Sequence, residues 1–192
     1  YYGNQKDFGI AIAEALNQEV LSLANAGCRH IQIDEPLFAR YPEKALEFGI
    51  DNLERSFKNC PATVDRTVHM CCGYPDKIDV SDYPKAPLKS YFLIADAMEQ
   101  SSVNTISIED AHRYNNLSLL ERFKKTKIIL GVVTIAKSHI ETVEEIRTRL
   151  LKASEHIDKK NLIAGPDCGL GILGRELAIK KMKNLSEAAH SI

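Results

Sequence analysis

The sequence predicts an α/β fold of the (β/α)8 barrel type, with this chain covering roughly the last five β/α units. The first observation is that predicted helices and strands alternate strictly, which is typical of parallel strands joined by right-handed crossovers. The second is that polar side chains follow the strands directly, as they do at the carboxyl-terminal rim of a barrel. A doubly wound sheet would place a site at the same strand ends. A typical barrel needs about 250 residues, whereas this chain has 192.

The first two helices and the first strand follow from local patterns. Apolar residues recur every four positions over residues 8–26, which predicts a helix, and Gly27 is suited to cap its end. The stripe consists of Phe8, Ile12, Leu16 and Val20. Residues 29–36 predict a brief strand that ends in two carboxylates and a proline. Another proline begins a helix predicted over residues 42–58.

The middle of the chain repeats this alternation. A β-type run over residues 63–68 leads into a histidine. The proline-rich passage 74–87 then predicts a long loop. A helix is predicted over residues 88–99, and the next strand, 104–108, ends at a glutamate. A short helix follows at residues 117–124.

The last third contains two more β/α units. Residues 127–133 form a strongly apolar strand. Thr142 and Glu145 have the spacing of a capping box near the start of the next predicted helix. The last strand covers residues 162–164, and the last helix covers residues 173–189.

Length and composition limit the classes of protein to which this chain can belong. The length fits one domain, and an apolar content of 44% is enough for a substantial core. The formal net charge of −1 gives no reason to expect nucleic acid or an anionic membrane surface as partner. No apolar run approaches the roughly 18 residues of a membrane span. We therefore expect residues 1–192 to be one domain, the C-terminal part of a barrel whose N-terminal strands are absent.

The cysteines and the start of the sequence indicate the setting. An odd number of cysteines, five, argues against a disulfide framework and favours a reducing, cytoplasmic location. The start lacks the long apolar stretch of a signal peptide. It also lacks an initiator methionine, so we expect a processed or truncated piece. The open sheet edge of such a piece should pair with a second copy or with the missing N-terminal portion.

A histidine and a cysteine two residues apart follow the second predicted strand. In an extended chain, residues two apart point the same way, so His69 and Cys71 can face one point while Cys72 faces away. A converging imidazole and thiolate suit zinc. The pair alone would equally fit a buried strand end. Two further stretches, residues 105–110 and 163–169, strengthen the hypothesis of a metal site.

Four short motifs resemble, in their order, the C-terminal catalytic barrel of cobalamin-independent methionine synthase. They are Ile31-Gln32-Ile33-Asp34-Glu35-Pro36, His69-Met70-Cys71, Ile106-Ser107-Ile108-Glu109 and Pro166-Asp167-Cys168-Gly169-Leu170. The resemblance runs from about residue 8 to residue 189 and implies a catalytic zinc ion. The zinc ligands that it implies are His69, Cys71, Glu109 and Cys168.

The resemblance also implies what the site does. Asp34 would hold the amino group of homocysteine, and Glu35 beside it is a second candidate for substrate binding. Zinc would keep the thiol of homocysteine as a thiolate, and methyl transfer to this thiolate would give methionine. We expect Glu109 to yield its position to the substrate, because an oxygen ligand is easier to displace than a thiolate.

The sequence departs from the family at a residue that is thought to act on the methyl donor. The family has a histidine after the fourth strand that is thought to protonate the departing folate nitrogen, and here that position is Ala136. His139, three residues on, is the candidate catalytic substitute. The donor therefore stays open between methyltetrahydrofolate and a methylated corrinoid, which needs no proton. Alkyl transfer to another thiol such as coenzyme M, and a non-catalytic zinc-stabilised fragment, are the alternative functions.

Overall fold

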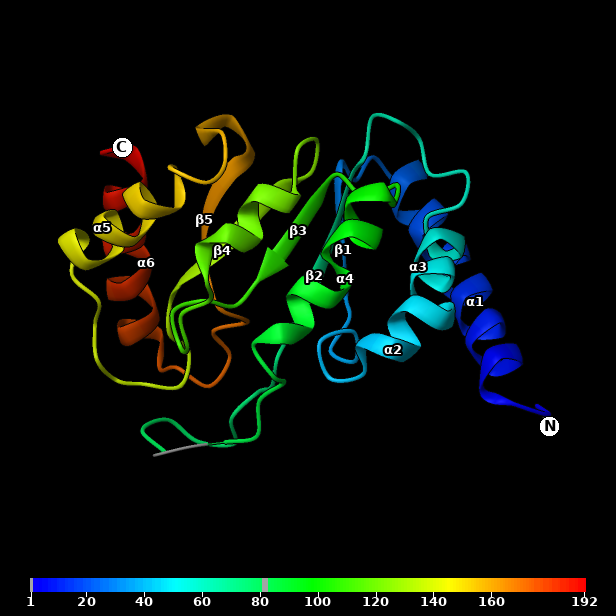
Figure 1. Cartoon of the computed structure of the whole chain (residues 1–192), viewed down its shortest axis with the longest axis horizontal. Helices are drawn as coiled ribbons and strands as arrows, with labels where there is room; N and C mark the ends of the chain where they lie inside the picture. Colours follow the sequence, from blue (N-terminus) through cyan, green and yellow to red (C-terminus); the bar gives the residue numbers. More distant parts are fainter. Residues whose placement is uncertain (1, 81–82) are drawn as a thin grey trace.

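Five parallel strands form one sheet. The computed structural model describes residues 2–80 and 83–192. The strands lie in the order β1-β2-β3-β4-β5 (Figure 1), and every neighbouring pair is parallel. They are β1 (His30–Asp34), β2 (Asp65–Met70), β3 (Thr105–Ile108), β4 (Lys127–Val133) and β5 (Leu162–Pro166). All of the predicted strands are present.

The strand order decides between the two architectures that the sequence allowed. A doubly wound sheet reverses its order at a switch point, whereas this sheet adds each new strand on the same side. An unreversed series of parallel strands is the arrangement of a barrel wall. The loops that follow the strands lie together on the lower side of Figure 1. The prediction of a barrel-type fold is therefore confirmed.

Helical segments alternate with the strands as predicted. They are α1 (Gln5–Asn25), α2 (Pro42–Lys44), the π-helical turn η1 (Ala45–Gly49), α3 (Ile50–Ser56), α4 (Lys89–Gln100), the 3-10 helix η2 (Leu117–Arg122), α5 (Val143–Ala153), the 3-10 turn η3 (Lys159–Asn161) and α6 (Arg175–His190). The predicted capping box is present at the start of α5, where Thr142 and Glu145 each bond the other's backbone N–H. None of the helices in the described residues combines the length and apolar character needed to cross a bilayer.

Three element boundaries differ from the prediction. The helix expected over residues 42–58 is interrupted by η1, a wide turn that ends at Gly49. A Cβ at Gly49 would lie only 2.8 Å from a ring carbon of Phe38, so the glycine allows the helix to approach this buried ring. The segment expected to be a short helix after residue 117 is a 3-10 helix. The second strand does not end before His69 but continues through it to Met70.

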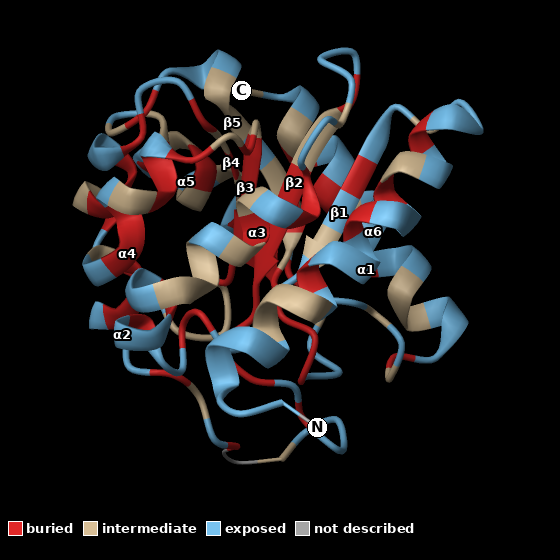
Figure 2. Cartoon of the chain, turned by 90° about the vertical axis from the view of Figure 1, so that its right-hand side faces the viewer, coloured by how far each residue is buried: buried red, intermediate tan, exposed pale blue. Residues whose placement is uncertain are grey.

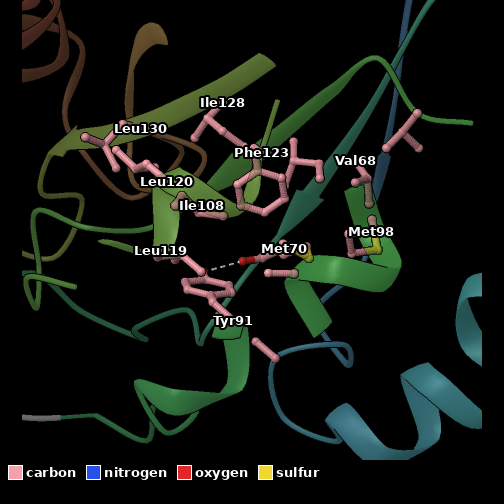
Figure 3. Packing of buried hydrophobic residues seen from close by; sticks show 14 of the residues in the cluster. Val68, Met70, Tyr91, Met98, Ile108, Leu119, Leu120, Phe123, Ile128 and Leu130 are labelled. Carbon is pink, nitrogen blue, oxygen red and sulfur yellow. Dashed lines mark hydrogen bonds between the residues drawn. The ribbon is translucent and has the colours of Figure 1, made fainter. Parts of the chain in front are cut away.

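The core lies between the sheet and the helices that cover its outer face. Val68 and Met70 alternate with Thr67 and His69 along β2, so one pair faces the helices and the other faces the opposite side of the sheet. Figure 3 shows the outward-facing residues packed against α4 and η2, and Figure 2 shows the buried residues concentrated on the central strands. Fully burying one such aliphatic side chain stabilises a fold by about 1.5–3 kcal/mol. The outer face of the sheet therefore supplies the stability, and the inner face is free to carry polar groups.

An apolar groove lies exposed beside the edge strand β1. On α1 only Val20 of the predicted stripe is buried, with 4% of its surface exposed, whereas Phe8 is 50%, Ile12 44% and Leu16 41% exposed. Phe8, Ile12 and Leu16 line a groove of about 560 Å³ between α1 and the segment from β1 to α3. In the described residues β1 pairs on one side only, with β2. The prediction of an open sheet edge therefore fits the structure.

A buried ion pair fastens α6 to the loop after β4. The ammonium of Lys181, with a fully buried side chain, lies 2.9 Å from an oxygen of Glu141 and 3.0 Å from the carbonyl oxygen of Thr134. The other oxygen of Glu141 accepts hydrogen bonds from the backbone and hydroxyl of Thr134. The lysine thus occupies a position on the packed face of its helix, where periodicity alone predicts an apolar residue.

We predict that Lys181→Met destabilises the fold by about 3 kcal/mol, because Glu141 is left buried without its cation. Urea unfolding monitored by circular dichroism measures the change. The double variant Lys181→Met/Glu141→Gln should recover part of the loss, and Lys180→Met, on the exposed face of the same helix, is the control. A single Lys181→Met variant as stable as the parent would contradict the prediction.

We also predict that the chain associates through the groove on α1 at micromolar concentration. Ile12→Asp should weaken association by about tenfold or more, because burying one aliphatic side chain is worth about 1.5–3 kcal/mol. Light scattering over a dilution series measures the mass, with Gln18→Asp, outside the groove, as the matched control. A parent chain that stays monomeric throughout the series would rule this out.

Candidate metal centre

Three donor atoms meet at the carboxyl ends of β2 and β5. His69 lies within β2, Cys71 follows that strand, and Cys168 follows β5. Their ligand atoms all lie within 4.8 Å of one another. The Nε2 atom of His69 is 3.2 Å from the Sγ atom of Cys168, which is 3.9 Å from the Sγ atom of Cys71. The structure therefore brings together three of the four side chains that the sequence analysis selected as metal ligands.

The orientation of His69 is set by the neighbouring strand. Its Nδ1 atom lies 2.9 Å from the hydroxyl oxygen of Ser107, which is its register partner on β3. This contact turns the opposite ring nitrogen toward the two sulfur atoms, as carbonyl and hydroxyl partners commonly do for histidine ligands. Sequence reasoning gave Ser107 no role. Its position two residues before Glu109, on the same face of a predicted strand, was the available signal.

The three side chains perturb one another's proton affinity. The contact between the two thiols lowers the pKa of Cys168, whereas the same contact and burial raise the pKa of Cys71 well above its ordinary value. Burial lowers the pKa of His69, but its hydrogen bond with Cys71 and two nearby carboxylate charges outweigh burial and raise it. Cys168 is thus the first of the two thiols to ionise. A bound cation would favour loss of the second proton, because a metal ligand must be deprotonated.

Glu109 lies beside this group, but other partners hold its carboxylate. One oxygen accepts the backbone N–H of Cys72 at 2.7 Å, and the other is paired with the ammonium of Lys85. Burial lowers the pKa of Lys85, but the charge of Glu109 outweighs it, so the net shift is upward. In the described residues the close donor group comprises His69, Cys71 and Cys168. Coordination by Glu109 therefore stays a prediction.

Lys85 was not among the residues selected from the sequence. It lies in the loop between β2 and α4, which the sequence marked only as proline-rich. A single lysine in such a loop is ordinarily solvated, and no spacing relates it to Glu109. Only the return of the loop toward the strand end brings its ammonium to the buried carboxylate.

Tyr91 connects the ends of β2 and β3 beneath the site. Its hydroxyl donates to the carbonyl oxygen of Met70 at 2.7 Å (Figure 3) and accepts the backbone N–H of Glu109 at 3.2 Å. The thiol of Cys72 also bonds this hydroxyl, at 3.1 Å. Burial raises the pKa of Cys72 to about 11. Cys72 therefore points away from the three donor atoms, as its position in the strand pattern predicted.

Asp167 fixes the loop that follows Glu109. Its fully buried carboxylate accepts the consecutive backbone N–H groups of Asp110, Ala111 and His112 at 2.7–2.9 Å. Burial and the charge of Glu109 raise the pKa of Asp167 to about 7, against the effect of the three amides. The residue directly precedes Cys168, so one side chain joins the two loops that carry candidate ligands.

Gly131 of β4 and Arg149 of α5 accommodate the buried carboxylates of Asp167 and Asp110. A Cβ at Gly131 would lie 2.3 Å from an oxygen of Asp167, so β4 must present a glycine where that carboxylate crosses it. Arg149 of α5 forms a bidentate ion pair with the fully buried carboxylate of Asp110, at 2.6 and 2.8 Å. Both buried carboxylates of the loop are therefore compensated by donors, as buried charges must be.

The remaining selected residues lie around the group at different depths. Asp34 is the register partner of His69 on β1, is exposed, and accepts a hydrogen bond from Gln32 at 2.8 Å. Glu35 is half-buried against the apolar groove, and burial raises its pKa. His139 is an exposed residue of the loop after β4, with its Nε2 atom 3.7 Å from a carboxylate oxygen of Glu145. The roles of all three in substrate binding or proton transfer stay predictions.

Comparison with known proteins gives a consistent result. The model of the family described as "Cobalamin-independent synthase, Catalytic domain" matches residues 4–191. A methionine synthase of Pyrococcus furiosus is 26% identical over 193 residues, covering 100% of this chain and 52% of that protein. A methionine synthase of Saccharolobus islandicus is 30% identical over 189 residues, covering 97% of this chain and 51% of that protein. The chain thus spans about half the length of these relatives.

Solved structures show the same relationship. A B12-independent methionine synthase from a Shewanella species, in complex with selenomethionine, superposes with a TM-score of 0.88 at 26% identity. The match covers 100% of this chain and 56% of that chain. A methyltransferase from Methanosarcina mazei, at 18% identity and a TM-score of 0.65, shares the fold.

We predict that Asp167→Asn destabilises the protein by about 2 kcal/mol, because the amide NH2 of asparagine replaces one of the two oxygens that accept the three N–H groups and leaves a buried N–H donor without an acceptor. The variant is compared with the parent by urea unfolding. Asp96→Asn, which alters an exposed ion pair with Arg122, should leave stability nearly unchanged. Equal stability of Asp167→Asn and the parent would show that the three N–H groups do not need both carboxylate oxygens as acceptors.

Proposed function

The chain belongs to the catalytic-domain family of cobalamin-independent methionine synthases, and from this premise we propose that it is a zinc-dependent methyltransferase acting on the thiol of homocysteine. The observation that carries the proposal is the meeting of one imidazole and two thiol groups at the ends of β2 and β5. The chain spans about half the length of its methionine synthase relatives, so the activity of a whole enzyme is itself part of this proposal.

The donor set fits zinc. In a tetrahedral site with Zn–S bonds of about 2.3 Å, two sulfur ligands lie about 3.8 Å apart. The two sulfur atoms here are 3.9 Å apart, so little movement is needed to bind the ion. Three protein ligands with a fourth, exchangeable position are typical of a catalytic rather than a structural zinc site. We propose His69, Cys71 and Cys168 as the permanent ligands and Glu109 as the exchangeable one.

The proposed chemistry is nucleophilic methyl transfer. Zinc, when bound, lowers the pKa of a coordinated thiol so that the substrate is a thiolate at neutral pH. Asp34, next to His69 in the sheet, is placed to accept the ammonium group of the amino acid. The substrate sulfur then forms a bond to the methyl carbon while the bond from that carbon to the donor breaks. Exclusion of water from the buried His69 and Glu109 strengthens these electrostatic contacts.

The identity of the donor follows from where the proton would come from. A departing folate nitrogen needs a proton, whereas a departing corrinoid does not. Ala136 is fully buried and has no proton to give, and the candidate substitute His139 is exposed and paired with Glu145. We therefore favour a methylated corrinoid, with methyltetrahydrofolate as the second possibility if His139 reaches the donor.

We expect the purified protein to bind one equivalent of zinc, and Cys168→Ala to lower zinc affinity at least a hundredfold and abolish methyl transfer. Metal analysis and chelator competition measure binding. Assays combine homocysteine or coenzyme M with methyltetrahydrofolate or methylcobalamin, and identify thiol and donor. Cys28→Ala, at the opposite end of the sheet, is the matched control.

The rival function is a zinc-stabilised fragment without catalysis. Cobalt substitution separates the two, because the visible spectrum of a catalytic site changes when homocysteine enters the coordination sphere and that of a closed site does not. Less than half an equivalent of zinc after reconstitution would reject both. Methyl transfer to coenzyme M but not to homocysteine would reassign the substrate.

A further inference from the structure

Both oxygen atoms of Glu109 are occupied by protein donors that lie outside the group of three ligands. Lys85 pairs with one oxygen and the backbone N–H of Cys72 bonds the other. The side chains of Lys85 and Glu109 are only 8% and 4% exposed, so solvent screens this ion pair little. Separating the members of a buried pair is expensive unless a new partner replaces the lost one.

The position of Lys85 is fixed by its own backbone. The loop after β2 folds back on itself, so that Ala86 donates its N–H to the carbonyl oxygen of Cys72 at 2.9 Å. The guanidinium of Arg113 bonds the carbonyl oxygen of Ala86 from the other side. The Lys85 ammonium also lies 4.7 Å from the ring centroid of Tyr83. These contacts therefore fix the position of the ammonium beside Glu109.

Glu109 cannot keep this arrangement and also complete a tetrahedral metal site. Ligand atoms around zinc lie within about 4 Å of one another, given bonds of about 2.0–2.3 Å. The carboxylate of Glu109 is outside the set whose atoms lie within 4.8 Å. To join His69, Cys71 and Cys168, it must move away from Lys85, from the N–H of Cys72, or from both.

We propose that Lys85 is a positioning residue that competes with the metal ion for Glu109. The carboxylate then has two alternative partners, the metal and the Lys85 ammonium. The ion pair with Lys85 therefore weakens the binding of Glu109 to the metal. Its effect is to keep the fourth coordination position available to a substrate thiol. The proposal rests on the proposed function, since it takes the metal at His69, Cys71 and Cys168 as given.

The test measures zinc affinity rather than turnover. Lys85→Met should raise zinc affinity about tenfold, because Glu109 loses its alternative partner and the metal becomes its better one. Lys85→Arg, which keeps the charge, should return affinity toward that of the parent. In a Glu109→Ala background Lys85→Met should have no effect. The matched control is Lys127→Met, which removes an ion pair with Asp65 at the amino end of β4.

A second readout follows the exchangeable position. In the cobalt-substituted Lys85→Met protein, the homocysteine concentration that gives half of the spectral change should rise about tenfold, as Glu109 now resists displacement. Circular dichroism and urea unfolding check that the variants fold. If Lys85→Met does not fold, Lys85→Gln, which keeps a polar contact with Glu109 but no charge, takes its place.

The outcomes separate this proposal from the function on which it rests. Zinc binding by the parent with unchanged or weaker binding by the Lys85 variants would overturn the role of Lys85 alone. An effect of Lys85→Met that persists in the Glu109→Ala background would also overturn it, because the lysine would then act on another ligand. No zinc binding by the parent protein would overturn both.

Discussion

The contact between His69 and Cys168 depends on curvature of the sheet. Strands β2 and β5 are separated by β3 and β4. In a flat sheet three strand spacings place their ends about 14 Å apart, yet the ring nitrogen and the sulfur are 3.2 Å apart. Strong bending toward the inner face, as in a barrel wall, lets side chains span this separation. The geometry of this candidate metal site is thus a consequence of the barrel-type fold and does not arise from either loop alone.

Three buried carboxylates at the carboxyl ends of the strands each have a donor in place. Glu109, Asp110 and Asp167 are all buried and meet an ammonium, a guanidinium and backbone amides respectively. Such compensation avoids the cost of an unpaired buried charge. It also joins the loops after β2, β3 and β5 into one network, since Tyr91 bonds Cys72 and Glu109, and Asp167 bonds the backbone from Asp110 to His112. Candidate ligands from distant parts of the sequence are therefore held by shared supports.

The open edge at β1 bears on the substrate side of the proposed site. Asp34 is exposed on this edge strand, and Glu35 faces the apolar groove beside it. The three candidate metal ligands come from the end of β2, inside the sheet, and from the end of β5, which in the described residues pairs with β4 alone. The candidate substrate residues Asp34 and Glu35 lie at the end of β1, which pairs in the described residues with β2 alone. The donor atoms of His69, Cys71 and Cys168 therefore meet within this chain, whereas Asp34 and Glu35 lie at an edge of the sheet.

The sequence by itself determined the alternation of helices and strands, the parallel sheet and the pairing of His69 with Cys71, because periodicity and strand-end position are local properties of the chain; Cys168 was added by the motif that resembles a known family. Tertiary structure decided the partners of those residues. Ser107, Lys85 and Asp167 act across strands and loops, and nothing in their own neighbourhoods distinguishes them from ordinary polar residues. The same reason explains why the contact between Glu109 and Lys85 was not predicted: it depends on distances that exist only after the chain has folded.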